Sequence, residues 1–189
     1  MAENTRKRSQ TKEKLKSALI ELCEEKSYYE ITVWDICERA GLYRSTFYRY
    51  YDAKDDILRE IEHEYIEDTQ NLTPTLWSIR ADASKEEMEA YRKELTADME
   101  YHRTHRQICR FLLSPGGDIY FYNKMIESIG QSMMKNFQQY GTGRGKNKDY
   151  LKILFASGFV STIHEWLKKD DCSPAEIADF LISMILKLQ

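Results

Sequence analysis

Proline and glycine are scarce in this sequence, with three prolines and eight glycines among 189 residues. Both interrupt regular backbone, so their scarcity permits long helices and argues against a fold of many short strands. Long apolar runs are missing too, because the longest nearly apolar stretch, residues 153–163, is far shorter than the roughly 20 residues that span a bilayer. The first residues are polar and charged, unlike a secretory signal. We therefore expect a cytoplasmic protein without a membrane segment.

The sequence also lacks closely spaced cysteines. Its four cysteines are widely separated, at Cys23, Cys37, Cys109 and Cys172. No CxxC pair occurs, and that spacing is typical of zinc ribbons and dithiol redox sites. Cys23 and Cys37 lie among apolar residues, so we interpret them as small core residues rather than reactive thiols.

Catalytic and cofactor motifs are not recognisable. The chain has no phosphate-binding GxxxxGKS/T motif, no HExxH motif and no nucleophile elbow. His102, His105 and Cys109 have a spacing that could present metal ligands on one helix face. However, Thr104 with Gln107 looks like a capping box, which would place His102 outside that helix. We therefore predict no enzyme activity, no cofactor and no metal.

Positive charge is in slight deficit overall, since the net charge is -3, but it is unevenly distributed. Residues 1–16 contain six basic and two acidic side chains, and residues 39–54 contain four basic and one acidic. The rest of the chain carries the acidic excess. Two basic segments on either side of one short stretch are typical of a nucleic-acid-binding surface.

Helical periodicity runs through nearly the whole sequence. Ser173, Pro174 and Glu176 form a typical helix start, and the segment at 114–117, SPGG, is a typical stop. We predict an all-α fold of about nine helices. Their expected ranges are 10–26, 33–40, 44–50, 54–71, 84–101, 104–113, 118–140, 148–168 and 174–187.

Residues 31–51, ITVWDICERAGLYRSTFYRYY, predict a helix-turn-helix. Thr32 is expected to cap the first helix with Asp35 as its capping-box partner. Gly41 is expected to end that helix, because glycine tolerates the left-handed backbone of a helix C-terminus. A tight turn with glycine and a second short helix then complete the motif.

The second helix of this motif is expected to have a buried and an exposed side. Phe47 and Tyr51 are four residues apart and share one face, which should pack against the other helices. An arginine on the opposite side can pair with guanine in the major groove, and hydroxyl groups can contact several base edges. The same pattern would also fit ordinary solvated residues on a small bundle. The outward and flanking residues are Ser45, Thr46, Tyr48 and Arg49.

Residues 44–51, RSTFYRYY, followed by residues 54–58, KDDIL, resemble the DNA-binding signature of the TetR family. In that signature a glycine-led turn precedes a short recognition helix that ends in aromatic residues, and a lysine begins the next helix. The resemblance implies that Thr32 and Lys54 contact phosphates and that Tyr48 contacts the DNA backbone. It further implies a group of residues at or near the bases, namely Arg44, Ser45, Thr46 and Arg49.

Two positions depart from the family pattern. Tyr43 stands where serine or another small polar residue is usual, so a cap is lost and a bulky phenol is added at the edge of the groove. We favour Tyr43 as a phosphate or base contact over an exposed aromatic residue without a role. Ala53 stands where a serine or asparagine cap is common, which leaves Asp52 as the candidate cap.

The C-terminal part resembles, through looser motifs, the C-terminal domain of TetR regulators related to dihydroxyacetone-kinase regulators. These motifs are RFLLSPGG at 110–117, FASGF at 155–159 and EWL at 165–167. We therefore expect a DNA-binding domain at 1–55, linked through the helix at 54–71 to a regulatory and dimerisation domain at 72–189.

Pairing of two chains is expected because one short recognition helix reads few base pairs. TetR-like proteins usually dimerise through the last two helices, and here both look too apolar for the remaining chain to cover. The same faces could instead close the chain's own core. The predicted interface residues are Phe155, Gly158, Phe159, Trp166, Phe180 and Met184.

The family resemblance also implies a small-molecule effector pocket in the C-terminal domain. Aromatic and methionine side chains there could line an apolar site, although such residues at helical spacing are also typical of an ordinary core. The candidates are Trp77, Tyr101, Phe111, Tyr122 and Met125.

The sequence thus predicts a homodimeric regulator that binds a two-fold symmetric duplex, most simply a repressor released by a small molecule. Two alternatives stay open. One is a DNA-binding scaffold or activator whose C-terminal domain binds a protein partner. The other is a small-molecule-binding or catalytic helical protein that has lost DNA binding.

Overall fold

The structure is a computed structural model that describes residues 2–73, 78–80, 82–112, 119–139 and 148–187. Over these residues the chain forms nine α-helices and one 3-10 turn and has no strand, which confirms the all-α prediction. The elements are α1 Ala2–Glu25, η1 Tyr28–Glu30, α2 Val33–Ala40, α3 Arg44–Phe47, α4 Lys54–Leu72, α5 Lys85–Thr104, α6 Arg106–Leu112, α7 Ile119–Gln139, α8 Lys148–Lys169 and α9 Pro174–Lys187.

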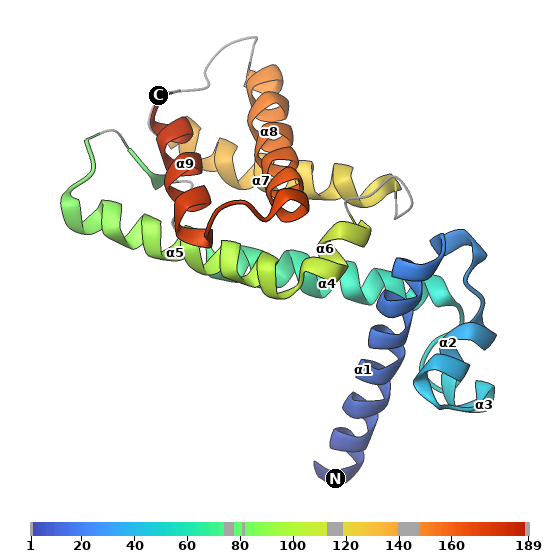
Figure 1. The fold of residues 1–189 in the computed structure, drawn as a ribbon. Coiled ribbons are helices and arrows are strands. Elements are labelled where there is room, and N and C mark those ends of the chain that lie inside the picture. The colour runs from blue at the N-terminus through green and yellow to red at the C-terminus, as the bar shows by residue number, and fades with distance from the viewer. Residues whose placement is uncertain (1, 74–77, 81, 113–118, 140–147, 188–189) are drawn as a thin grey trace.

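The helices form a small unit and a larger one that share a long helix (Figure 1). Residues 2–53, which form α1, η1, α2 and α3 and are here called the head, lie at one end of the molecule. α4 leaves the head and runs beside α5 into the larger unit, here called the body, in which α7, α8 and α9 lie across α4 and α5. The domain boundaries at residues 55 and 72 stay a prediction, because α4 packs against both α1 and α5.

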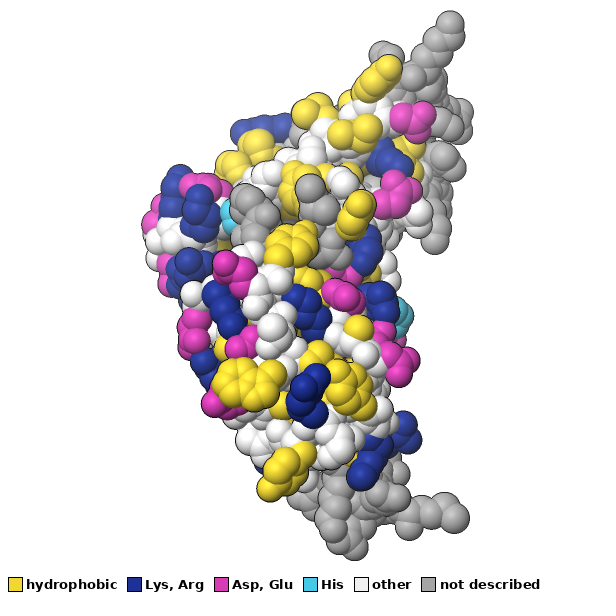
Figure 2. Space-filling view, turned by 90° about the vertical axis from the view of Figure 1, so that its right-hand side faces the viewer, with side chains coloured by type: hydrophobic (Ala, Val, Ile, Leu, Met, Phe, Trp, Pro, Cys, Tyr) yellow, Lys and Arg dark blue, Asp and Glu magenta, His cyan; other side chains and the backbone are white. Residues whose placement is uncertain are grey.

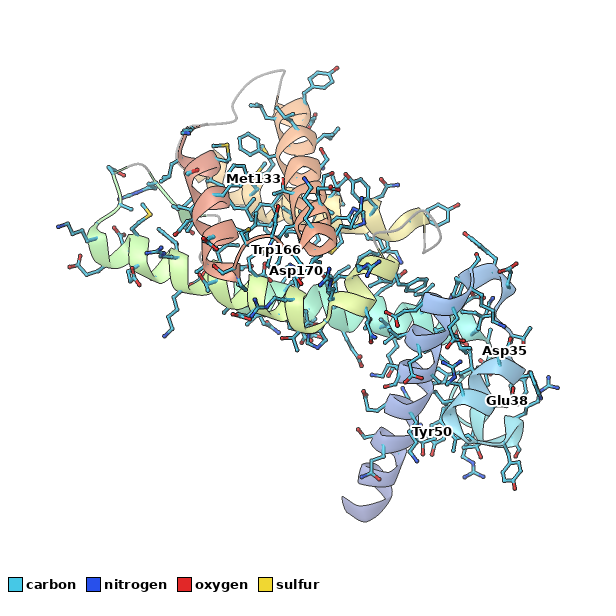
Figure 3. All side chains as sticks on the ribbon, in the orientation of Figure 1. Asp35, Glu38, Tyr50, Met133, Trp166 and Asp170 are labelled. Atoms are coloured by element: carbon cyan, nitrogen blue, oxygen red, sulfur yellow. The ribbon has the colours of Figure 1, made fainter. Side chains whose placement is uncertain are left out.

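The body is built from two helix pairs, α5 with α9 and α7 with α8. Met133 and Trp166 are buried between α7, α8 and α9 (Figure 3). In the head, Cys37 is buried and Cys23 packs against the core, as expected from their apolar neighbours. Burial raises the pKa of the Cys23 thiol to about 12, so this group stays protonated at neutral pH.

α1 is held against α4 by ion pairs between residues 48 positions apart. Lys16, only 6% exposed, donates hydrogen bonds to both carboxylate oxygens of Glu64, and its Nζ lies 2.7 Å from Glu13. Lys12 pairs with Glu60 at 2.5 Å. Burial alone would lower the pKa of Lys16, but Glu13 and Glu64 outweigh it and the pKa is raised. The join between head and body is therefore electrostatic as well as apolar.

The expected capping box at Thr104 is wrong. α5 continues to Thr104 and ends at His105, whose amide donates to the Tyr101 carbonyl. The helix extends this far because Met99 and His102 in its last turns are buried against the body. α6 begins only at Arg106.

Two boundaries in and near the head also differ from expectation. α3 is helical only from Arg44 to Phe47, and the next three residues form turns. Asp52 does not cap α4. The Asp56 carboxylate takes that role, because it accepts hydrogen bonds from the Asp52 amide at 2.9 Å and the Ala53 amide at 2.8 Å.

Replacing Lys16 with methionine should lower the free energy of unfolding by about 1–3 kcal/mol, because Glu13 and Glu64 would lose the cation between them. Urea-induced unfolding at low salt measures this loss. Lys14→Met, on the exposed side of the same helix, is the matched control and should change the stability by less than about 0.5 kcal/mol. Equal losses in the two variants would contradict the role of Lys16.

Candidate nucleic-acid interface

The start of α2 is fixed by the predicted capping box. The Asp35 amide donates to the Thr32 hydroxyl at 3.2 Å, and the Thr32 amide donates to the Asp35 carboxylate at 2.7 Å. The Thr32 hydroxyl also donates to the Asp35 carboxylate at 2.7 Å. The hydrogen bonds that the Thr32 hydroxyl and amide donate lower the pKa of Asp35 to about 2. At the other end, Gly41 adopts the expected left-handed backbone with φ 64°. Both caps depend on neighbouring residues only, and both predictions are confirmed.

The side of α3 that faces the molecule is aromatic, as predicted. Phe47 is fully buried and Tyr51 is 5% exposed, with their ring centroids 5.9 Å apart. The Tyr51 hydroxyl donates to Glu60 on α4 at 3.2 Å. Ser45 and Arg49 are exposed on the outer surface. The recognition segment, residues 44–51, therefore presents hydroxyl and guanidinium groups to the solvent and is held by the buried rings of Phe47 and Tyr51.

Tyr43 and Tyr48 lie at the two ends of α3 and differ in their contacts. Tyr43, at the position before the helix, is 83% exposed and its side chain forms no cap. Tyr48 packs its ring edge-on against Phe47. The Arg44 guanidinium lies 6.0 Å above the Tyr48 ring, with a nitrogen 3.5 Å from its hydroxyl. Arg44 is thus partly oriented by Tyr48, whereas Tyr43 is unconstrained. Thr46 is half-buried.

Lys54, expected to contact a phosphate, is half-buried and held by backbone carbonyls. Its Nζ donates to the backbone carbonyls of Tyr28 at 2.6 Å and Ile31 at 2.7 Å, and it lies 4.3 Å from the centroid of the Tyr28 ring. Burial lowers the pKa of Lys54. The side chain therefore fastens the segment before α2 onto the start of α4, and its contact with a phosphate stays a prediction.

Much of the positive charge in the head is neutralised within the chain. Besides Lys12 and Lys16, Arg39 pairs with Glu25 at 2.7 Å and with Glu21 at 3.4 Å. Except for Glu13, three positions from Lys16, these partners lie 14 to 48 positions away in the sequence, so no local pattern reveals them. Among the described side chains of the head, the basic residues without a carboxylate partner are Arg8, Lys14, Arg44 and Arg49. Arg8 lies over the Tyr50 ring, which fills the space between α1 and α3 (Figure 3).

The predicted effector-pocket residues have separate neighbours. The Tyr101 hydroxyl donates to Asp68 at 2.8 Å, and the Tyr101 ring stacks on His105 with centroids 4.0 Å apart. Phe111 is buried against Tyr28, with ring centroids 6.0 Å apart, so it faces the head.

The other two described candidates lie on α7. The Tyr122 hydroxyl lies 2.9 Å from that of Ser161 on α8, and Met125 is buried. Trp77 lies outside the described residues. A shared pocket for this set therefore stays a prediction.

A buried polar cluster joins α4, α5 and α6. It consists of Tyr65, Asp98, His102 and Cys109, and we call it the relay. His102 Nε2 lies 3.4 Å from Asp98, His102 Nδ1 contacts the Tyr65 hydroxyl, and that hydroxyl lies 3.1 Å from Cys109 Sγ. From the sequence alone, His102 and Cys109 are candidates only as metal ligands. The i, i+4 spacing of Asp98 and His102 was the one local sign of their pairing.

The charge state of His102 sets the direction of the relay's hydrogen bonds. Burial alone would lower the pKa of His102, but the Asp98 carboxylate outweighs it and raises the pKa to about 10. A protonated imidazole donates from both nitrogens, so Nδ1 donates to Tyr65 and the Tyr65 hydroxyl donates to Cys109. Asp98 Oδ1 is buried and has no hydrogen-bond partner.

The predicted dimer residues fall into three classes: buried, half-buried and exposed. Phe159 and Trp166 are buried within the single chain, and Trp166 Nε1 donates to the Cys172 carbonyl at 2.9 Å. Phe155 and Met184 are half-buried. Gly158 is exposed with no atom within 4 Å of an added Cβ, and Phe180 is 48% exposed. Further exposed apolar side chains extend this face of α8: Tyr150, Ile153 and Leu154.

The described ranges contain neither a candidate metal site nor a helix that could span a membrane. No three His, Cys, Asp or Glu side chains among those residues come together as a possible metal site. No helix formed by those residues combines the length and apolar character that crossing a membrane requires.

Two family models match the sequence. Residues 16–61 match a model described as bacterial regulatory proteins, tetR family. Residues 89–187, more than half of the chain, match a model described as transcriptional regulator C-terminal region. A search of curated proteins gives no match.

Solved structures share this fold at low sequence identity. A TetR transcriptional regulator from Streptococcus agalactiae is 20% identical over 97% of both chains, with a TM-score of 0.66. The dihydroxyacetone kinase operon activator DhaS is 16% identical over 92% of this chain and 93% of its own, with a TM-score of 0.58. FadR from Thermus thermophilus, a TetR-family repressor in complex with lauroyl-CoA, is 18% identical over 92% of both chains, with a TM-score of 0.50.

The relay should make stability depend on pH through His102. Its pKa is raised on folding, so the stabilisation is complete below the unfolded value, about 6.5, and is lost as pH rises through about 10. The wild type should therefore lose on the order of 3 kcal/mol between pH 6 and pH 10 from this group. His102→Gln should lack this part of the decline. Urea unfolding at several pH values measures it.

His63→Gln is the matched control, because His63 is exposed on the same long helix that carries Tyr65. It should follow the wild-type pH dependence. A His102→Gln curve parallel to that of the wild type would show that His102 does not carry the charge.

Proposed function

We propose, since this chain belongs to the TetR family of bacterial transcriptional regulators, that it is a homodimeric repressor of transcription. It binds a two-fold symmetric duplex and releases it when a small molecule binds the body. The observation that carries this proposal is the segment at 44–51, α3 and the residues that follow it, in which Phe47 and Tyr51 are buried while Ser45 and Arg49 face solvent. A helix held in this way can enter the major groove with its polar side toward the base edges.

The predicted DNA contacts take separate roles in this proposal. Exposure supports Arg44, Ser45 and Arg49 as base contacts, and half-buried Thr46 lies beside them. Thr32, Tyr48 and Lys54 are assigned to phosphates and Tyr43 to the edge of the groove. The hydroxyl of Thr32 also donates to Asp35 at 2.7 Å, and Lys54 is held by two carbonyls. These two residues therefore act on DNA chiefly by fixing the start of α2.

Dimerisation is assigned to the exposed apolar face of α8 and α9. Leu154 is 65% exposed, Ile153 is exposed beside it on α8, and Phe180 is exposed on α9. Gly158 would let the helices of two copies approach closely, because nothing lies where a Cβ would stand. Two paired copies present two recognition helices to two half-sites.

Effector binding is assigned to the body. The FadR structure with lauroyl-CoA supports a small-molecule ligand for a chain of this fold. α6 lies between the two units, because its Cys109 belongs to the relay and contacts Tyr65, while its Phe111 packs on Tyr28 of the head. A ligand with different affinities for two positions of α6 would change the population of DNA-competent heads.

Activation of transcription is the second candidate, and the fold likeness to the operon activator DhaS supports it. In that case the body of the DNA-bound dimer would contact a protein partner. Transcription measured in vitro from a template with the bound site distinguishes the two signs of regulation.

Selection of bound fragments from random duplex DNA should recover a two-fold symmetric site. Arg49→Ala should then weaken binding by about 1–3 kcal/mol and relax specificity at one base pair of each half-site. Arg103→Ala, an exposed arginine on α5, is the control and should bind like the wild type. Absence of any preferred duplex at physiological salt would overturn the proposed function.

Lys54→Met, measured beside Arg49→Ala, separates the two roles of Lys54. A direct phosphate contact predicts that the slope of log affinity against log salt falls by about one unit. The internal role alone predicts an unchanged slope with lower stability, because two carbonyls lose their donor.

Leu154→Asp should convert the dimer to a monomer at micromolar concentration, because a carboxylate would be buried without a partner at the interface. Analytical ultracentrifugation measures the change, and affinity for the two-fold site should fall with it. Tyr120→Asp, at an exposed position on α7, is the control and should stay dimeric. A dimeric Leu154→Asp variant would place the interface elsewhere.

A further inference from the structure

The exposed large apolar side chains of the described chain lie in two regions. Those on the body are Tyr120, Tyr150, Ile153, Leu154 and Phe180, most of them on the proposed dimer face. The others lie in and beside the head: Tyr29, Trp34, Tyr43 and Tyr48. In Figure 2 the head, in the lower part of the view, carries large hydrophobic side chains with Lys and Arg among them. Exposed aromatic groups on such a small unit indicate a surface that is covered by a partner.

The four aromatic side chains of this region differ in their contacts with the rest of the described chain. Tyr29 and Tyr48 pack edge-on against Tyr28 and Phe47. By contrast, the side chains of Tyr43, 83% exposed, and Trp34, 56% exposed, have no hydrogen bond or ring contact in the described chain. Tyr43 directly precedes α3, and Trp34 is the second residue of α2. Both therefore lie at the beginning of a helix of the helix-turn-helix.

From this arrangement we infer that the head recognises thymine in the major groove, by apolar contact of the Tyr43 ring, and secondarily of Trp34, with thymine methyl groups. The inference rests on the proposed DNA-binding function and names what that surface reads. Thymine is the base that presents a methyl group in the major groove, and apolar side chains recognise it there. Tyr43 adjoins Arg44, so its ring reaches the same base edges as the recognition helix.

The distribution of charge in the head favours apolar contact with thymine over binding that depends mainly on phosphates. Lys12, Lys16 and Arg39 pair with carboxylates, and Lys54 with carbonyls. Because few of the basic side chains that the structure describes in the head are free of such partners, release of counterions through them contributes less to binding. Apolar contacts in the groove then supply a larger share of both affinity and selectivity.

The test uses the duplex recovered from random DNA and replaces single thymines with deoxyuridine, which removes the methyl group and keeps the hydrogen-bonding edge. For the wild type, at least one replacement in a half-site should weaken binding about fourfold. Tyr43→Ala should bind the thymine duplex about as weakly as the wild type binds that uridine duplex. On the uridine duplex, Tyr43→Ala and the wild type should have the same affinity. Tyr43→Phe, which keeps the ring, should bind the thymine duplex like the wild type.

Other outcomes overturn the inference. If every uridine duplex binds like its parent, no methyl group is read. If Tyr43→Ala loses equally on both duplexes and Tyr43→Phe loses as much, the hydroxyl contacts a phosphate instead. In both cases DNA binding itself persists, so the proposed function stands without the inference. If no duplex is preferred at all, the proposed function fails and the inference fails with it. Trp34→Ala, tested in the same way, locates the second methyl group.

Discussion

The position of the recognition segment depends on the burial of Phe47 and Tyr51. α3 has only four helical residues, and a helix of that length has no stability of its own in water. Its direction is therefore set by the two rings beneath it. The Tyr51 hydroxyl donates to Glu60, which also receives Lys12 from α1. Tyr51 thus joins the recognition segment to α4 and, through Glu60, to α1.

What the sequence predicts correctly is local. The cap at Thr32, the left-handed Gly41 and the buried face with Phe47 depend on neighbours within a few residues, so periodicity and capping patterns find them. The pairing of Lys16 with Glu64 does not, because 48 residues separate the partners. The sequence therefore predicted the helices and the side of α3 that faces solvent, but overestimated the basic charge available to DNA, since Lys12 looks free until α1 and α4 are brought together.

The relay was missed for the same reason. Tyr65 meets His102 and Cys109 across 37 and 44 positions of sequence, and only their packing brings three helices to one hydroxyl group. A buried cluster of this kind is costly when incompletely paired. Movement of α5 or α6 relative to α4 must therefore either break these hydrogen bonds or carry α4 along. This makes the middle of α4 responsive to movements of the body.

The start of α4 meets a second connection from α6 at Tyr28. The Tyr28 ring lies against Phe111 of α6 and under the Lys54 ammonium group, and its hydroxyl donates to Asp55. Gln107 on α6 also donates to Glu24 on α1 at 3.2 Å. A displacement of α6 thus reaches the head directly and through α4, and both paths end at residues around the segment before α2. Neither path includes Phe47, so the recognition segment keeps its own shape. In the proposed effector switch, a displacement of α6 would therefore change the angle of the whole head, and with it the spacing of the two recognition helices in the proposed dimer.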